Sequence, residues 1–167
     1  MYDASPDLLR DILANIESQP DKEITHRIIQ LFTNAKLPIK VKHHDPDAPW
    51  NWYRISLYNQ KNTETVIIST KTGYGKNAVA GLNLQFRIKN SLTFSNLNEF
   101  SPNIRKQILT GRDCSYCLTG CKGSDYIFEY QGNTFIKCMN IGCNFRAKNI
   151  EKNDIPSILT IINMEIA

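Results

Sequence analysis

The chain has 167 residues, of which 41% are hydrophobic, and a formal net charge of +4. This length and apolar content are sufficient for one folded domain and exclude an intrinsically disordered chain. No apolar run approaches the roughly 20 residues that a membrane-spanning helix needs, and the N-terminal residues lack a basic and then apolar leader. We therefore expect a cytoplasmic protein without a membrane partner.

Two amphipathic helices are predicted at the start of the chain. Residues 5–18 begin with a serine that can act as an N-cap, Pro6 follows at the first helical position, and the apolar residues then recur at helical spacing. After a polar break, Asp21 can cap a second helix. This helix is expected to end near Ala35, because Pro38 disfavours a helical residue before it.

Four strands are predicted in the middle of the chain, where apolar and polar residues alternate. The segments are 52–58, 65–69, 82–89 and 91–96. The third alternates most regularly, because its apolar residues are separated by glutamine, arginine and lysine. This pattern is typical of an antiparallel sheet with one face in contact with water.

Two further helices are predicted on either side of the cysteine-rich part of the chain. Ser101 and Pro102 open a short helix that Gly111 closes, which is the usual placement of proline and glycine at helix ends. Asn153 or Asp154 caps the last helix. The cysteines are therefore expected between two helices.

Together these elements predict an α+β fold. It has an antiparallel sheet with N-terminal helices, and a C-terminal metal-bound hairpin followed by a helix. No internal repeat or linker is evident. We therefore expect a single domain over residues 1–167, in which residues 112–167 form an integrated cysteine-rich lobe that binds zinc.

All five cysteines lie in one short stretch, spaced Cys114-x2-Cys117-x3-Cys121 and then Cys138-x4-Cys143. An odd, clustered set in a reducing compartment indicates metal binding or redox chemistry rather than a disulfide framework. A gap of two residues lets two sulfurs converge on one metal from a tight turn. The cluster is therefore the strongest chemical signal in the chain.

A hairpin is predicted between the two groups of cysteines. Residues 126–130 and 134–138 have the composition of strands, and Gln131-Gly132-Asn133 between them is a turn signal. Such a hairpin returns the second group of cysteines beside the first.

The spacing resembles a zinc ribbon or zinc knuckle over about thirty residues, and it departs from that pattern in the four residues between the last two cysteines. The resemblance implies one structural Zn²⁺ held by four thiolates, in a closed site with no open position for a substrate. The whole chain also looks like bacterial proteins, a resemblance that implies no function. The predicted ligands are Cys114, Cys117, Cys138 and Cys143, with Cys121 as an alternative ligand or a free thiol.

Other chemistries for the cysteines remain open. They are an iron–sulfur cluster, a thiol redox switch and free core thiols. Cys121 supports the redox alternative, because Lys122 beside it can lower the pKa of the thiol and a fifth thiol can replace a ligand.

Two loops are predicted to carry polar clusters. Residues 42–47 gather two histidines and two aspartates, and we favour a solvated turn over a metal or acid–base site because adjacent histidines point apart in an extended chain. Residues 71–77 combine glycines with lysines but match neither the Walker spacing nor the dinucleotide fingerprint. We expect a hairpin loop there, with lysines that can contact a partner.

Aromatic and basic residues supply the candidate contact surface. The run from Trp50 to Tyr53 can stack on a ligand or a partner, although alternate members of such a run in a strand belong to the core. The basic residues of the glycine loop and of the third strand can contact phosphate or an acidic partner if they share one face. The predicted binding residues are Trp50, Trp52, Tyr53, Arg54, Lys71, Lys76, Arg87 and Lys89.

We assign no catalytic residues, because no serine–histidine–aspartate set, paired carboxylates or activated cysteine–histidine pair stands out. The first hypothesis is a non-enzymatic, zinc-containing binding protein with a regulatory role, whose partner is a protein or a small molecule. The second is a nucleic-acid-binding protein that uses the basic sheet face and the zinc knuckle. The third is a thiol redox sensor or enzyme that uses Cys121.

Overall fold

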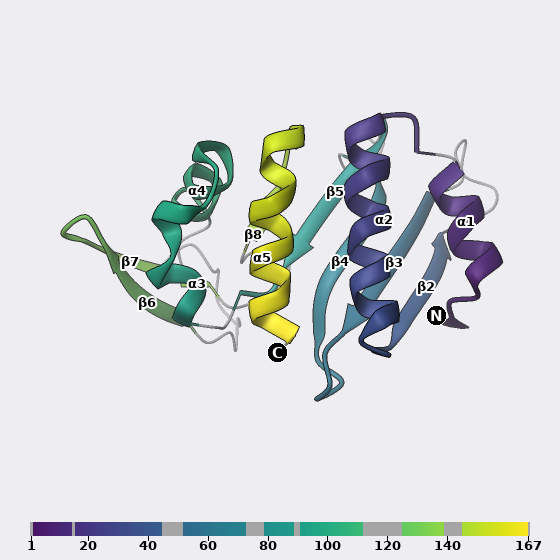
Figure 1. The fold of residues 1–167 in the computed structure, drawn as a ribbon, viewed down its shortest axis with the longest axis horizontal. Helices are drawn as coiled ribbons and strands as arrows, with labels where there is room; N and C mark the ends of the chain where they lie inside the picture. The colour runs from purple at the N-terminus through teal and green to yellow at the C-terminus, as the bar shows by residue number, and fades with distance from the viewer. Residues whose placement is uncertain are drawn as a thin grey trace.

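The structure is a computed structural model, shown in Figure 1. It describes residues 2–14, 16–44, 52–72, 79–88, 91–111, 125–138 and 145–166. The helices are α1 (Pro6–Ala14), α2 (Gln19–Asn34), α3 (Ser91–Ser95), α4 (Pro102–Leu109) and α5 (Ile155–Ile166). The strands are β1 (Tyr2–Asp3), β2 (Ile39–His44), β3 (Trp52–Tyr58), β4 (Glu64–Thr72), β5 (Val79–Phe86), β6 (Asp125–Tyr130), β7 (Asn133–Cys138) and β8 (Phe145–Ala147). In these ranges no helix has both the length and the apolar character needed to cross a bilayer.

Six strands form one antiparallel sheet in the order β1-β2-β3-β4-β5-β8. Its register aligns the apolar residues of successive strands into rows, and one of these rows runs through Val41, Ile55, Ile68, Leu84 and Ala147. All five are buried, and a parallel row ends on Phe86 and Phe145. Because successive side chains point to opposite faces, both rows lie on the same face of the sheet. The predicted α+β fold with an antiparallel sheet is therefore confirmed.

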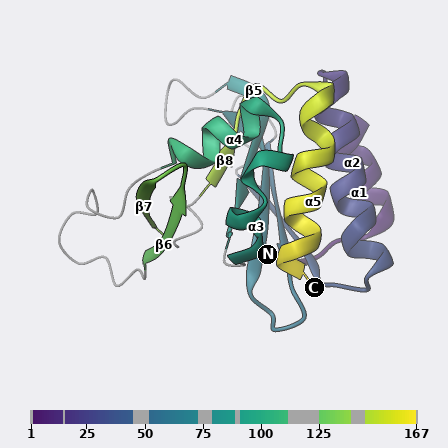
Figure 2. The same cartoon turned by 60° about the vertical axis from the view of Figure 1, so that its left-hand side comes forward.

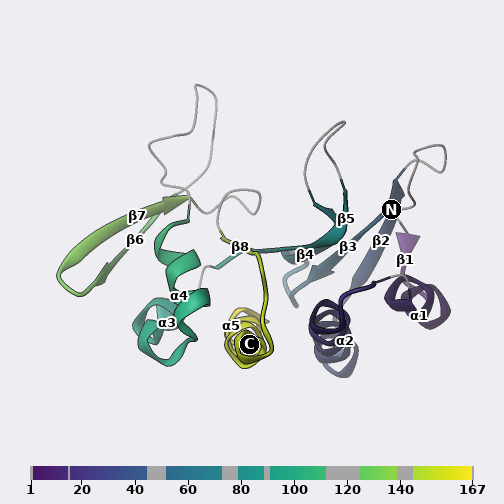
Figure 3. The ribbon, with the colours of Figure 1, turned by 90° about the horizontal axis from the view of Figure 1, so that it is seen from above.

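The helices cover this apolar face, which we call the helix face. Figure 3 shows α1, α2 and α5 side by side on it, seen end-on. Ile24, Ile28 and Phe32 of α2 are fully buried, as are Ile158 and Ile161 of α5. Their spacing of three or four residues is the amphipathic pattern that predicted these helices.

Serine N-caps fix the starts of the helices. The Ser5 hydroxyl accepts from the Leu8 N–H at 3.2 Å, and the Ser18 hydroxyl accepts from the Asp21 N–H at 3.4 Å. In α1 and α2 a proline follows within the first two positions, as predicted for the first helix. The expected cap of the second helix was wrong by one turn, because Ser18 takes that place and Asp21 lies inside the helix.

The hairpin β6–β7 forms a separate two-stranded sheet, which confirms the predicted hairpin. Its turn has positive φ angles at Gln131 (49°) and Gly132 (74°), the combination that suits the twist of a two-residue hairpin. Phe128 packs between Phe94 and Phe135, with ring centroids 4.4 and 5.1 Å away. Figures 1 and 2 show the hairpin beside α3 and α4, and Figure 3 shows it at the end of the molecule far from β1.

Two further sequence predictions were wrong in this fold. The segment 91–96 is mostly the helix α3 rather than a strand, because Phe94 and Leu97 are both buried and residues three apart share a side only in a helical conformation. Residues 42–44 belong to β2 rather than to a turn, because Val41 and its neighbours extend the apolar rows of the sheet. Residues 45–50 lie outside the described residues.

Candidate functional site

The face of the sheet opposite the helices, which we call the open face, is basic. None of the described helices lies on it (Figure 3). The register aligns Lys42 with Arg54, and Gln85 with Arg146. Alternation along the strands places five bases on this face. They are Lys40, Lys42, Arg54, Arg87 and Arg146.

Arg54 is the centre of a hydrogen-bonded group on the open face. Its guanidinium donates to both carboxylate oxygens of Glu64, at 2.9 and 3.0 Å, and its Nε donates to the Ser56 hydroxyl at 3.2 Å. The Arg54 side chain is 35% exposed, while Ser56 beneath it is fully buried. Arg54 is therefore held flat against the sheet, and Glu64 neutralises its charge.

Glu64 neutralises one of the five bases, and Lys42 and Arg87 are two of the other four. Within the described part of the chain, neither has a carboxylate partner, and Lys42 is exposed. The Arg87 N–H donates to the Thr65 carbonyl at 2.8 Å, which continues the pairing of β4 and β5 past Phe86. The Arg87 Nε is buried and has no hydrogen-bond acceptor among the described residues.

The structure separates the predicted aromatic and basic residues. Arg54 and Arg87 share the open face, whereas Tyr53 lies on the helix face, where its ring stacks on His43 at 4.7 Å. The Tyr53 N–H also donates to the Thr70 hydroxyl at 2.9 Å. The other predicted binding residues fall wholly or by their side chains outside the described residues: Trp50, Trp52, Lys71, Lys76 and Lys89.

Three bases of the open face, Lys40, Lys42 and Arg146, were absent from the sequence prediction. The reason is that β2 and β8 were not predicted as strands. A signal was present, because Ile39-Lys40-Val41-Lys42 and Phe145-Arg146-Ala147 alternate apolar and basic residues. Strands this short are difficult to recognise until their neighbours are known.

Cys138 is the one predicted metal ligand among the described residues. It ends β7 opposite Asp125 and is fully buried. Next to it, the buried Lys137 ammonium donates to the Gly111 carbonyl at 2.8 Å, which connects the end of α4 to β7. The remaining predicted ligands, Cys114, Cys117, Cys121 and Cys143, lie outside the described residues. The described residues contain no group of three or more potential metal ligands.

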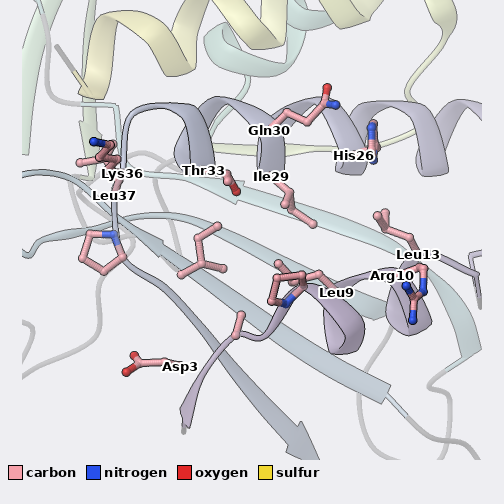
Figure 4. A pocket seen from close by; sticks show the side chains of 14 residues that line it. Asp3, Leu9, Arg10, Leu13, His26, Ile29, Gln30, Thr33, Lys36 and Leu37 are labelled. Carbon is pink, nitrogen blue, oxygen red and sulfur yellow. The ribbon is translucent and has the colours of Figure 1, made fainter.

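A groove with a volume of about 660 Å³ runs between α1 and α2, on the helix side of the sheet. Figure 4 shows Leu9 and Ile29 inside it, with Arg10 and His26 at one end and Lys36 at the other. Leu9 and Ile29 are less than a tenth exposed, so the groove has an apolar floor. This site was not predictable from the sequence, because a groove depends on how two helices pack.

A buried carboxylate joins α4 to α5. Asp154 is only 2% exposed and accepts from the Ser101 hydroxyl at 2.5 Å, from the Asn103 amide at 2.6 Å and from the Glu151 N–H at 3.0 Å. Burial by itself raises the pKa of Asp154, but the three hydrogen bonds outweigh it, and the net pKa is lowered. Every donor around this carboxylate belongs to a helix start, so we assign it a structural role.

Comparison of the chain with protein-family models, with curated proteins and with solved structures found no match.

Proposed function

We propose that this chain is a non-enzymatic binding protein whose contact surface is the open face and whose partner is a single-stranded nucleic acid. The observation that supports this is the register, which gathers bases from β2, β3, β8 and the residue after β5 on the surface that none of the described helices covers. Lysine and arginine side chains that neutralise phosphates supply most of the sequence-independent affinity for nucleic acids.

A single strand suits this surface better than a duplex does. The open face is a broad sheet, and sheets of this kind bind single strands with phosphates on cations and bases stacked on rings. Tyr58 offers such a ring, with the Lys40 ammonium 5.3 Å from its centroid. Asn83 and Gln85 lie on the same face and can donate to base edges.

We also propose that the chain holds one structural Zn²⁺ in a reducing, cytoplasmic environment. The ligands would be Cys114, Cys117, Cys138 and Cys143, with Cys121 as alternative ligand or free thiol. Two observations support it: Cys138 is buried at the end of β7, and both Gly111 and Asp125 contact β7 beside it. These two residues flank the segment that carries the first three cysteines, so the chain enters and leaves that segment close to Cys138.

The zinc proposal is tested by elemental analysis of protein purified without added metal or chelator, combined with thiol counting. We expect one zinc and a single alkylatable thiol per chain. Iron with sulfide would indicate the iron–sulfur alternative, and five free thiols without metal would leave the redox switch and free core thiols as the alternatives.

The nucleic-acid proposal is tested by fluorescence anisotropy with a labelled oligo(dT) over a range of salt concentrations. The logarithm of the association constant should fall linearly with the logarithm of salt concentration, and the combined Lys42→Gln and Arg87→Gln substitutions should reduce the slope by about 1.4, or 0.7 for each lost phosphate contact. The matched control is Lys152→Gln, an exposed lysine just before α5, which should change neither quantity. Absence of binding at low salt, or equal effects of the paired substitutions and the control, would reject the proposal.

A further inference from the structure

We propose that the groove between α1 and α2 binds an amphipathic carboxylate, with an apolar chain along the groove floor and its carboxylate at the Arg10 end. The groove lies on the opposite side of the sheet from the open face, so the two sites are independent. Its volume of about 660 Å³ falls within the range of about 300–1,000 Å³ that is usual for small-molecule sites.

The two helices create the groove by the spacing of their residues. On α1, Pro6, Leu9 and Leu13 line one wall, and on α2 the residues 26, 29, 30 and 33 line the other. Positions three, four and seven apart lie on one side of a helix, so each wall is continuous for about two turns, or roughly 10 Å. Leu37 closes the floor where α2 leads into β2.

The charged residues of the groove, together with His26, are divided between its ends. Figure 4 shows Arg10 and His26 at one end, and Asp3 and Lys36 at the other. The second end combines Lys36 with the carboxylate of Asp3 in the lining, which disfavours a further anion there. At the first end no acidic residue lines the groove, because Asp7, which pairs with Arg10, lies outside the lining, and we assign the anionic head group to this end.

Arg10 is available to such a head group. Its guanidinium pairs with Asp7 at 2.9 Å, but the side chains of both residues are more than 70% exposed. An exposed ion pair three residues apart on a helix contributes little and is readily exchanged for another carboxylate. His26, on the facing wall, adds a donor for the same head group.

The probe is sodium decanoate below its micelle concentration, titrated into the full chain and followed by NMR chemical shifts and calorimetry, with 1-decanol as the neutral analogue. We expect saturable binding at one site, tighter for decanoate than for decanol, with shifts confined to α1, α2 and the start of β2. Arg10→Gln should weaken decanoate binding about five- to tenfold and leave decanol binding unchanged. Leu13→Asn, at a half-buried position, should weaken both ligands.

Arg27→Gln is the matched control, because Arg27 lies on α2, the other helix of the groove, and like Arg10 forms an exposed pair within its helix, here with Glu23, but does not line the groove. It should change neither affinity. His26→Gln provides a second test of the head-group end and, being exposed, should not disturb folding. Non-saturable binding, equal affinity for decanol and decanoate, or equal effects of Arg10→Gln and Arg27→Gln would overturn the proposal.

Discussion

The six-stranded sheet and the β6–β7 hairpin are stabilised in different ways. In the sheet, two apolar rows cross the strands and are covered by α1, α2 and α5. The contacts that attach the hairpin among the described residues include Phe128, which packs on Phe94, the buried Lys137, and the Tyr130 hydroxyl, which donates to the Asn98 side-chain oxygen at 2.7 Å. Its outer face leaves Ile127 65% and Ile136 45% exposed.

This difference indicates where extra stabilisation is needed. Removal of apolar surface from water is the dominant favourable term in folding. The six-stranded sheet and its helices bury much of the apolar surface of the described residues. A two-stranded hairpin alone is marginally stable at best. A metal bound near its end would contribute directly to the folding free energy of that part, which fits the position of Cys138 at the end of β7.

The largest expected effect comes from paired truncations in the two regions. Phe86→Ala, at a fully buried position in the sheet, should reduce the global free energy of unfolding by about 3–5 kcal/mol, because it leaves a cavity under the helices. Phe128→Ala should lower the free energy of hydrogen-exchange protection in β6 and β7 by a similar amount. The protection of β3, β4 and β5 should change by less than about 1 kcal/mol. Urea unfolding and native-state exchange measure the two quantities. Equal loss of protection in both sheets after Phe128→Ala would show that they unfold as one unit.

An intermediate effect is expected at Asp154, which ties α4 to α5. Asp154→Ala leaves three donors without their acceptor and should cost about 2–3 kcal/mol at pH 7. Because the folded pKa of this carboxyl is lowered from its ordinary value of 3.8, its ionised form adds stability above that value, and this contribution is lost as the pH falls toward the folded pKa. The free energies of unfolding of the wild type and Asp154→Asn, measured by urea unfolding, should therefore converge as the pH falls below about 4.

A constant difference between wild type and Asp154→Asn from pH 7 to pH 2.5 would contradict this assignment. Ser157→Ala serves as the matched control in the same junction. The Ser157 hydroxyl accepts from the Ser101 N–H at 2.8 Å but does not ionise. The loss in free energy of unfolding caused by Ser157→Ala should therefore not vary with pH over this range.

The long amphipathic elements were predictable from the sequence because each carries its own pattern. The helices α2 and α5 and the hairpin β6–β7 have apolar spacing and end signals within a single segment. The short strands β2 and β8 were missed, because each needs a partner strand to complete its row. β8 has only three residues and is recognisable only once Phe145 lies beside Phe86.

The candidate sites show the same limit. Arg54 and Arg87 were predicted as binding residues, and the structure places them on one face. Their neighbours Lys40, Lys42 and Arg146 were not predicted, because which bases converge is decided by strand order. The groove between α1 and α2 was beyond the reach of sequence patterns for the same reason, since its walls come from separate elements.

The smallest expected effect concerns the outer face of the hairpin. Ile127 and Ile136 are register partners and both are exposed, so Ile127→Thr with Ile136→Thr should change the free energy of unfolding by no more than about 0.5 kcal/mol, because threonine retains the strand preference. Urea unfolding and sedimentation equilibrium measure the outcome. A loss of more than about 1 kcal/mol that also depended on protein concentration would show instead that a second copy of the chain covers this face in solution, and the hairpin would then owe part of its stability to association.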